Sequence, residues 1–135
     1  MESKDKKKIQ IIDHKRLRDS FRYAFLGILQ AYKGEQNLKI HTVIAIMVII
    51  CGFIFDITYV EWLVCLVLIG LVLMAEFFNT AIEYVVDLAS PEIHPLAKAA
   101  KDTASSGVLM MAIVSAIIGL IIFIPHIILF VGEVL

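Results

Sequence analysis

The chain has 135 residues, of which 60% are apolar, and its formal net charge is −1. Its mean hydropathy is +0.88, and a soluble domain of this length could not hide so much apolar surface from water. The composition therefore excludes the ordinary globular classes and predicts one all-α integral membrane domain over residues 1–135, with no nucleic-acid partner. Cys51 and Cys65 both lie in apolar runs, which favours two small buried hydrophobes over a disulfide or a metal site.

A basic, helix-like segment precedes the long apolar runs. Residues 1–12 are charged, and we expect them to be frayed, and retained because no apolar run follows them at once. Over 13–33 the basic side chains fall largely apart from the apolar ones, which predicts an amphipathic helix in the membrane interface. A helix that binds a protein partner is the alternative. The apolar positions recur at three- and four-residue steps: Leu17, Phe21, Ala24, Phe25, Ile28, Leu29 and Tyr32.

Three apolar segments are long enough to cross a bilayer. The uncharged run over 40–55 predicts a first span at 38–56, in which Lys39 reaches the interface with its ammonium group. The second and third spans are predicted at 60–86 and 103–130. Pro125 and His126 are expected to kink or end the third helix, because proline cannot donate a backbone hydrogen bond.

The basic residues predict how the chain sits in the membrane. All 12 Lys and Arg lie either between Lys4 and Lys39 or at Lys98 and Lys101, the latter two between the second and third spans. By the positive-inside rule the N-terminus and the loop at 87–102 face the cytoplasm, and three spans then put the C-terminus outside. Tyr59 and Trp62 are expected at the outer interface as aromatic anchors. The predicted location is the bacterial plasma membrane.

Polar residues interrupt the second span near its expected cytoplasmic end. The stretch reads MAEFFNTAIEYVVD, residues 74–87. At about 100° per residue, Glu76, Asn79, Glu83 and Asp87 lie at roughly 0°, −60°, −20° and +20° around a helix. The four side chains therefore share one narrow stripe, which we call the polar stripe.

The polar stripe needs positive charge beside it. A charge near the hydrocarbon costs about 3 kcal/mol on insertion scales, and neighbouring carboxylates repel one another. One interpretation is structural, in which Lys101 or the N-terminal arginines pair with the stripe and specify packing. The other is a bound cation, with Mg²⁺ the leading candidate because it prefers hard oxygen ligands.

Two further features lie at the same expected level of the membrane. Glu35 precedes the first span, and Lys101-Asp102 opens the third, followed by the small residues of 103–107. Small residues permit close helix packing, and a single loop glutamate is usually only solvated. Together, however, carboxylates that hold Mg²⁺ beside a lysine that contacts phosphates are the parts of a phosphoryl-transfer site. No Walker A loop, kinase glycine-rich loop or dinucleotide fingerprint is present in the sequence.

These residues resemble a known family. EFFNTAIEYVVD at 76–87 and AAKDTASSGVL at 99–109 are similar to the signature of the small prokaryotic integral-membrane lipid kinases, which comprise diacylglycerol kinase and undecaprenol kinase. The resemblance covers nearly the whole chain and implies an ATP-dependent lipid kinase that requires Mg²⁺. It also implies a homotrimer with active sites shared between subunits.

The resemblance implies a role for each matching residue. Glu76 would be the general base toward the lipid hydroxyl, and Glu35 and Glu83 would hold the metal. The nucleotide would be bound by residues of the surface helix, the stripe, the cytoplasmic loop and the start of the third span: Arg16, Tyr23, Asn79, Asp87, Glu92, Ile93, His94, Lys101 and Asp102.

The resemblance also bears on the lipid acceptor. Gly34 stands where Gram-negative diacylglycerol kinases carry an asparagine, and residues 20–41 look more like the Gram-positive members. Undecaprenol is therefore the expected acceptor, with diacylglycerol as the alternative. A small ion-coupled transporter is a rival class, since it too carries membrane carboxylates, but it would leave Lys101-Asp102 without a role. A non-catalytic scaffold would not explain the polar stripe.

Overall fold

The computed structural model describes residues 14–134, and its elements are four α-helices. They are α1 (His14–Gly34), α2 (Gln36–Ile54), α3 (Tyr59–Ala89) and α4 (Pro95–Val134). Residues 1–13, which include the predicted frayed segment and the expected first residue of the surface helix, lie outside the described residues. Helix α1 forms one compact unit and residues 35–134 form another, so each is described by itself.

Three of the helices have the length and apolarity of membrane spans. Their candidate spans are Gln36–Ile54, Tyr59–Ala89 and Pro95–Gly132. A bilayer core of about 30 Å needs roughly 20 residues of helix, so all three can cross it. The predicted all-helical membrane class is therefore confirmed.

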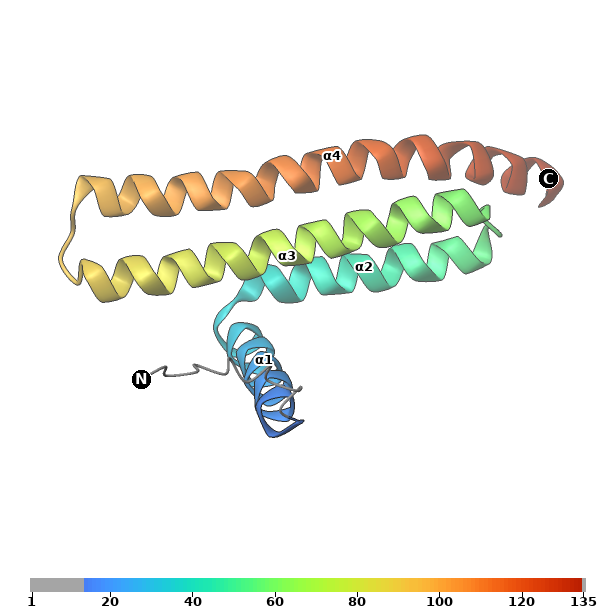
Figure 1. The fold of residues 1–135 in the computed structure, drawn as a ribbon. Helices are drawn as coiled ribbons and strands as arrows, with labels where there is room; N and C mark the ends of the chain where they lie inside the picture. Colours follow the sequence, from blue (N-terminus) through green and yellow to red (C-terminus); the bar gives the residue numbers. More distant parts are fainter. Residues whose placement is uncertain (1–13, 135) are drawn as a thin grey trace, which may run out of the picture. The chain divides into compact units, whose positions relative to one another are not determined.

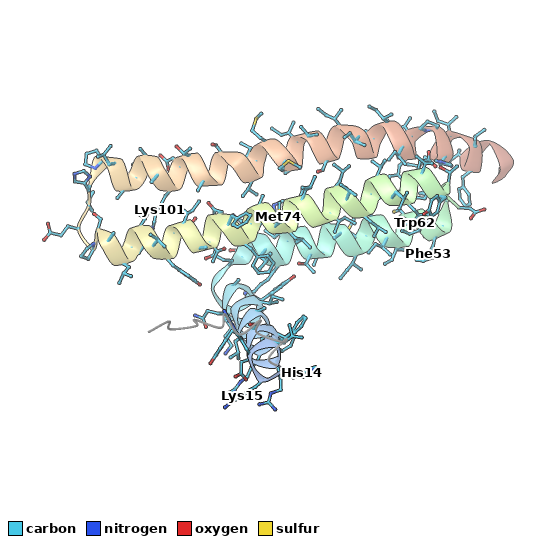
Figure 2. The ribbon with its side chains drawn as sticks, in the orientation of Figure 1. His14, Lys15, Phe53, Trp62, Met74 and Lys101 are labelled. Carbon is cyan, nitrogen blue, oxygen red and sulfur yellow. The ribbon has the colours of Figure 1, made fainter. Side chains whose placement is uncertain are left out.

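Helices α2, α3 and α4 run alongside one another, with α3 packed against both neighbours (Figure 1). The packing of α3 with α4 is more extensive than that with α2. Many side chains on the outer surfaces of these helices point away from their neighbours (Figure 2). Such exposed apolar surfaces are expected of helices whose surroundings are lipid or other protein chains.

A tight connection joins α2 to α3 at residues 55–58. The Phe55 N–H donates to the Cys51 carbonyl over 2.9 Å, and the Ile57 N–H donates to the Gly52 carbonyl over 3.2 Å. Asp56 has φ of 48°, a left-handed conformation that aspartate tolerates better than most residues. The turn is short, so α2 and α3 are antiparallel neighbours.

A capping box begins α3. The Thr58 N–H and hydroxyl both donate to Glu61 Oε2 over 2.7 Å, and the Glu61 N–H donates to Thr58 Oγ1 over 3.4 Å. The Glu61 carboxylate also lies 3.2 Å from His126 Nε2 on α4. This network ties the start of α3 to the C-terminal half of α4.

The apolar core of residues 35–134 lies next to this connection. Ile57, Cys65 and Ile122 are buried together. The Phe55 ring makes edge contacts with Phe123 on α4, at a centroid distance of 6.2 Å. Cys65 is a free thiol in this core, so the prediction of a small buried hydrophobe is confirmed for it.

Helix α4 is longer than the span expected at 103–130. It begins at Pro95, because proline suits the first turn of a helix and His94 Nδ1 accepts a hydrogen bond from the Leu96 N–H over 3.2 Å. At the other end the helix continues through Pro125. Of the two expected alternatives, a kink or an end at Pro125, the end does not occur, and neighbouring groups in a membrane helix can compensate the hydrogen bond that proline removes.

Candidate active site

The polar stripe is one continuous face of α3. Glu76, Asn79 and Thr80 are buried, with 2% exposure for Glu76, while Glu83 is half-buried and Asp87 exposed. Along the stripe, Asn79 Nδ2 donates to Glu83 Oε1 over 2.8 Å. The Thr80 hydroxyl donates to the Glu76 carbonyl over 3.0 Å. Solvent exposure therefore increases along the stripe, from the buried Glu76 to the exposed Asp87, over about three turns of helix.

Two buried oxygen atoms of the stripe accept no hydrogen bond. These atoms are Glu76 Oε1 and Asn79 Oδ1. Buried polar atoms are nearly always satisfied in folded proteins, so each such exception calls for a functional explanation. Both atoms are acceptors, which indicates a site that can take a donor or a cation.

Helix α4 closes one side of the stripe with a lysine. Lys101 Nζ lies 2.6 Å from Asp87 Oδ1, and its charge also acts on Glu83. Lys101 is on the part of α4 that runs beside α3 (Figure 2). The sequence-based expectation that Lys101 lies at the level of the stripe agrees with this contact.

Helix α2 contributes a histidine and the glutamate that precedes it. His41 Nε2 lies 3.2 Å from Glu76 Oε1, within ion-pair range but without the alignment of a hydrogen bond. Glu35 is the N-cap residue of α2 and makes no capping hydrogen bond with its side chain. The charges of Glu35 and Glu83 both act on Glu76, so the three carboxylates belong to one cluster.

Other predicted site residues lie at the edges of this cluster or beyond it. Asp102 pairs with Lys98 over 2.5 Å on the exposed face of α4. Glu92, Ile93 and His94 form the exposed loop between α3 and α4. The Glu92 carbonyl accepts a hydrogen bond from the Ser90 hydroxyl over 3.0 Å, and His94 caps α4. These contacts shape the loop and leave the Ile93 side chain fully exposed.

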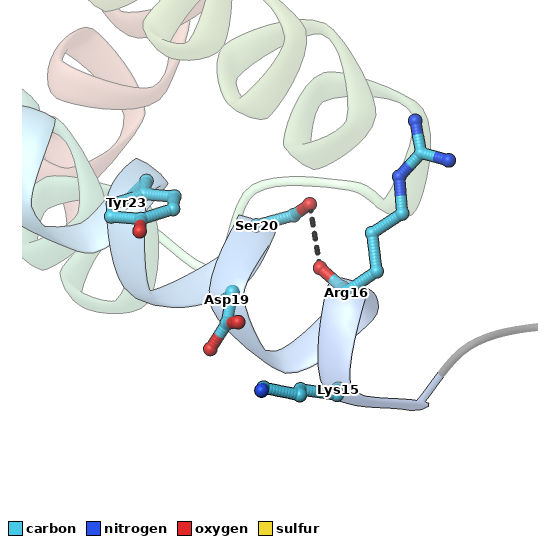
Figure 3. A pocket seen from close by; sticks show the side chains of 5 residues that line it. All are labelled: Lys15, Arg16, Asp19, Ser20 and Tyr23. Atoms are coloured by element: carbon cyan, nitrogen blue, oxygen red, sulfur yellow. Dashed lines mark hydrogen bonds between the residues drawn. The ribbon is translucent and has the colours of Figure 1, made fainter.

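A hollow on the surface of α1 holds the two remaining predicted residues, Arg16 and Tyr23. Its other lining residues are Lys15, Asp19 and Ser20 (Figure 3). The Ser20 hydroxyl donates to the Arg16 carbonyl over 2.9 Å. The hollow is lined by two cationic side chains, one carboxylate, one hydroxyl and one aromatic ring.

Sequence reasoning missed two members of the cluster, His41 and Thr80. Helical periodicity relates residues of one helix only, so it could not bring His41 of α2 to the stripe on α3. At about 100° per residue, Thr80 lies at roughly +40° on the scale that places Glu76 at 0°. The same helical period could therefore have identified it. Only the pairing of α2 with α3 could show the contact between His41 and Glu76.

The described residues do not build a complete metal site from protein groups alone. Within 14–134, no three His, Cys, Asp or Glu side chains gather closely enough to hold an ion by themselves. Mg²⁺ is commonly bound by one or two carboxylates together with substrate phosphates. Glu35 and Glu83 are the two carboxylates that the sequence predicted for this role.

The fold and the cluster define an integral membrane protein with a polar, carboxylate-rich site at one end of its helices. The sequence matches the family model for prokaryotic diacylglycerol kinase over residues 22–123. The chain belongs to the prokaryotic diacylglycerol kinase family, and it is a lipid kinase, as the sequence predicted.

Individual relatives support this assignment. Undecaprenol kinase of Bacillus subtilis (strain 168) is 45% identical over 106 residues, which are 78% of this chain and 86% of that protein. A diacylglycerol kinase of Synechocystis sp. is 37% identical over 107 residues, 78% of this chain and 61% of that protein. Diacylglycerol kinase of Escherichia coli (strain K12) is 29% identical over 104 residues, 77% of this chain and 85% of that protein.

Proposed function

We propose that this chain transfers the γ-phosphoryl group of ATP to the hydroxyl of undecaprenol. The observation that carries the proposal is the cluster around Glu76, a buried carboxylate whose stripe is closed by Lys101. The choice of acceptor rests on the 45% identity to an undecaprenol kinase. Diacylglycerol is the second candidate, because the other relatives named above are diacylglycerol kinases.

Glu76 is the general base in this proposal. Its carboxylate is shielded from water and, at Oε1, lacks a hydrogen-bond donor, so it can accept the proton of an incoming hydroxyl. Glu76 and Glu83 are separated by about 10 Å of helical rise. This separation suits a lipid hydroxyl that meets the deeper carboxylate while the nucleotide stays nearer water.

Glu35 and Glu83 would hold Mg²⁺ together with the phosphates of the nucleotide. The donor set fits a hard cation, since it consists of carboxylates beside the unsatisfied carbonyl oxygen of Asn79. When bound, Mg²⁺ supplies neutralisation of the charge that develops on the phosphates. Lys101 would supply a second positive charge, with its ammonium group moving from Asp87 to a phosphate of the nucleotide.

The remaining predicted residues would bind the rest of the nucleotide. Asn79, Asp87 and Asp102 line the site beside Lys101. Glu92, Ile93 and His94 contact the adenosine end from the loop between α3 and α4. Arg16 and Tyr23 of α1 would also bind the nucleotide, since both side chains line the hollow on that helix.

The proposal places α1 in the cytoplasmic interface of a plasma membrane, as an amphipathic helix. The loop between α3 and α4 shares that side and the C-terminus lies outside, because the basic residues all lie between Lys4 and Lys39, in or before the first turns of α2, or near the start of α4. We also propose a homotrimer. Three helices leave Glu83 only half-buried, and neighbouring copies would enclose the site and cover the exposed apolar faces.

A direct assay tests the function. Purified protein in mixed micelles receives radiolabelled ATP, Mg²⁺ and either undecaprenol or diacylglycerol. We expect label in undecaprenyl phosphate at a kcat/KM well above that for phosphatidic acid formation. Preference for diacylglycerol would reverse the choice of acceptor, and label in neither lipid would overturn the proposal.

A further inference from the structure

The clearest contact that the proposed mechanism does not use is the one between His41 and Glu76. His41 Nε2 on α2 lies 3.2 Å from Glu76 Oε1 on α3, and the His41 side chain is 20% exposed whereas that of Glu76 is 2% exposed. Glu76 Oε1 has no hydrogen-bond donor among the described residues. The imidazole thus stands between a carboxylate shielded from water and more accessible surroundings.

The other charged groups around Glu76 do not offer a proton acceptor of the same kind. From the start of α2, Glu35 is negative, and along α3 Glu83 is negative as well, so both repel charge on Glu76. From α4, Lys101 faces Asp87 and Glu83. His41 is the basic side chain that the structure places against Glu76.

We propose that His41 is a positioning residue for the kinase reaction, which acts through Glu76 by taking over the proton that Glu76 receives from the lipid hydroxyl. The inference rests on the proposed role of Glu76 as the base. It adds a route by which Glu76 loses the proton and returns to its carboxylate form after each turnover.

Atoms and charge are conserved in the proposed step. The acceptor hydroxyl gives its proton to Glu76 while its oxygen forms a bond to the γ-phosphorus, and the bond from that phosphorus to the bridging oxygen breaks and releases ADP. Protonated Glu76 then passes the proton to the neutral His41 ring at Nε2. The imidazolium releases one proton to water on its accessible side.

The first test compares two histidines that each lie 3.2 Å from a glutamate. His41→Gln keeps a hydrogen-bonding side chain but cannot carry the proton, and we expect kcat to fall roughly ten- to a hundredfold with the KM for ATP changed less than about threefold. His126→Gln makes the same change beside Glu61 at the other end of α3 and serves as the matched control. It should keep the wild-type kcat.

The pH profile separates a proton-transfer role from a structural one. In the wild type, kcat should fall toward acid pH, because a His41 ring that is already protonated cannot accept the proton. His41→Gln should lose this limb of the profile, while His126→Gln retains it. An unchanged profile in His41→Gln would overturn the inference.

Chemical rescue gives an independent readout. His41→Ala removes the ring, and added imidazole should restore kcat in a concentration-dependent manner without changing nucleotide binding. Retained binding of Mg²⁺-ATP shows that the variant is folded. If Glu76→Gln abolishes turnover but His41→Ala is fully active, the inference alone fails. If Glu76→Gln is active, the base assignment and the inference fail together.

Discussion

Lys101 Nζ on α4 lies 2.6 Å from Asp87 Oδ1 on α3, and this pair joins the two helices at the water-facing end of the polar stripe. Its members are not deeply buried, since the Asp87 side chain is 62% exposed and that of Lys101 is 35% exposed. Exposed ion pairs contribute little to stability. The pair therefore contributes more to positioning Lys101 beside the stripe than to stabilising the packing of α3 against α4.

Replacing this lysine should harm catalysis more than folding. Lys101→Met removes the charge that would contact phosphate, and we expect a loss of kcat/KM for ATP of a hundredfold or more, with little change in the midpoint of thermal unfolding. Steady-state kinetics and a thermal melt in detergent measure the two effects. Lys98→Met, which breaks the exposed pair with Asp102, is the control and should change kcat/KM less than about threefold. Equal losses in both variants would argue against a special role for Lys101.

Removing the acid–base function of Glu76 should abolish turnover while leaving nucleotide binding intact. Glu76→Gln has nearly the same shape but cannot accept the proton, so kcat should drop by about 10²- to 10⁴-fold. Nucleotide affinity, measured by equilibrium binding of Mg²⁺-ATP, should stay within about threefold. Glu76→Asp keeps a carboxylate and should retain more activity than the glutamine variant. A glutamine variant with near-normal kcat would remove the assignment.

Divalent cations should be required through Glu35 and Glu83. Chelation with EDTA should abolish turnover, and added Mg²⁺ should restore it. Glu83→Gln should raise the Mg²⁺ concentration for half-maximal rate about tenfold or more, because one anionic oxygen ligand is lost. Glu61→Gln changes a carboxylate at the other end of α3 and should leave the Mg²⁺ requirement as it is. If the wild type, Glu83→Gln and Glu61→Gln all needed the same Mg²⁺ concentration for half-maximal rate, the metal assignment would be wrong.

A close approach at Gly52 should make that position intolerant of larger residues. A Cβ atom there would lie 2.7 Å from Trp62 Cη2 and 3.2 Å from Ile57 Cδ1. The indole ring is stiff, so Gly52→Ala should lower the free energy of unfolding by about 1–3 kcal/mol. Reversible unfolding in micelles measures the change.

The matched control for this substitution is Gly70→Ala. A Cβ at Gly70 meets nothing within 4 Å, so that variant should be as stable as the wild type or slightly more stable. Adding Trp62→Phe to Gly52→Ala should recover part of the loss if the indole is the obstacle, and strictly additive effects would show that it is not.

The capping box at the start of α3 should matter for stability alone. Thr58→Ala removes the hydroxyl that donates to Glu61 and accepts from its N–H, and loss of such a cap costs about 1 kcal/mol. Thr58→Ser keeps the hydroxyl and should stay close to the wild type. Unfolding measurements on both variants, with kcat as a second readout, test this expectation. A fall in kcat of Thr58→Ala in proportion to that of Glu76→Gln would contradict it.

Much of this architecture follows from local patterns in the sequence. Apolar runs predicted three spanning helices, and helical periodicity placed Glu76, Asn79, Glu83 and Asp87 on one face of α3. The level of Lys101 followed from its place at the start of the third span, on the same expected side of the membrane as the stripe. These inferences need only the geometry of single helices and the order of the elements.

The missed features depend on how helices meet. The contact of His41 with Glu76 requires the register between α2 and α3, which the turn around Asp56 sets. The contact of Glu61 with His126 requires α4 to continue past Pro125. The early start of α4 at Pro95 was missed because its first turns are polar and do not contribute to an apolar run.

The unequal lengths of the helices have a consequence for the membrane around the enzyme. Helix α2 has 19 residues whereas α3 has 31, so at 1.5 Å per residue α3 is longer by about 18 Å. Glu76 and Asp87 lie on one continuous helix. The distance between them therefore does not change when lipids of another acyl length surround it. The height of a lipid hydroxyl does change, by a few ångströms between thin and thick bilayers. Bilayer thickness would thereby set how often an acceptor reaches the buried carboxylate.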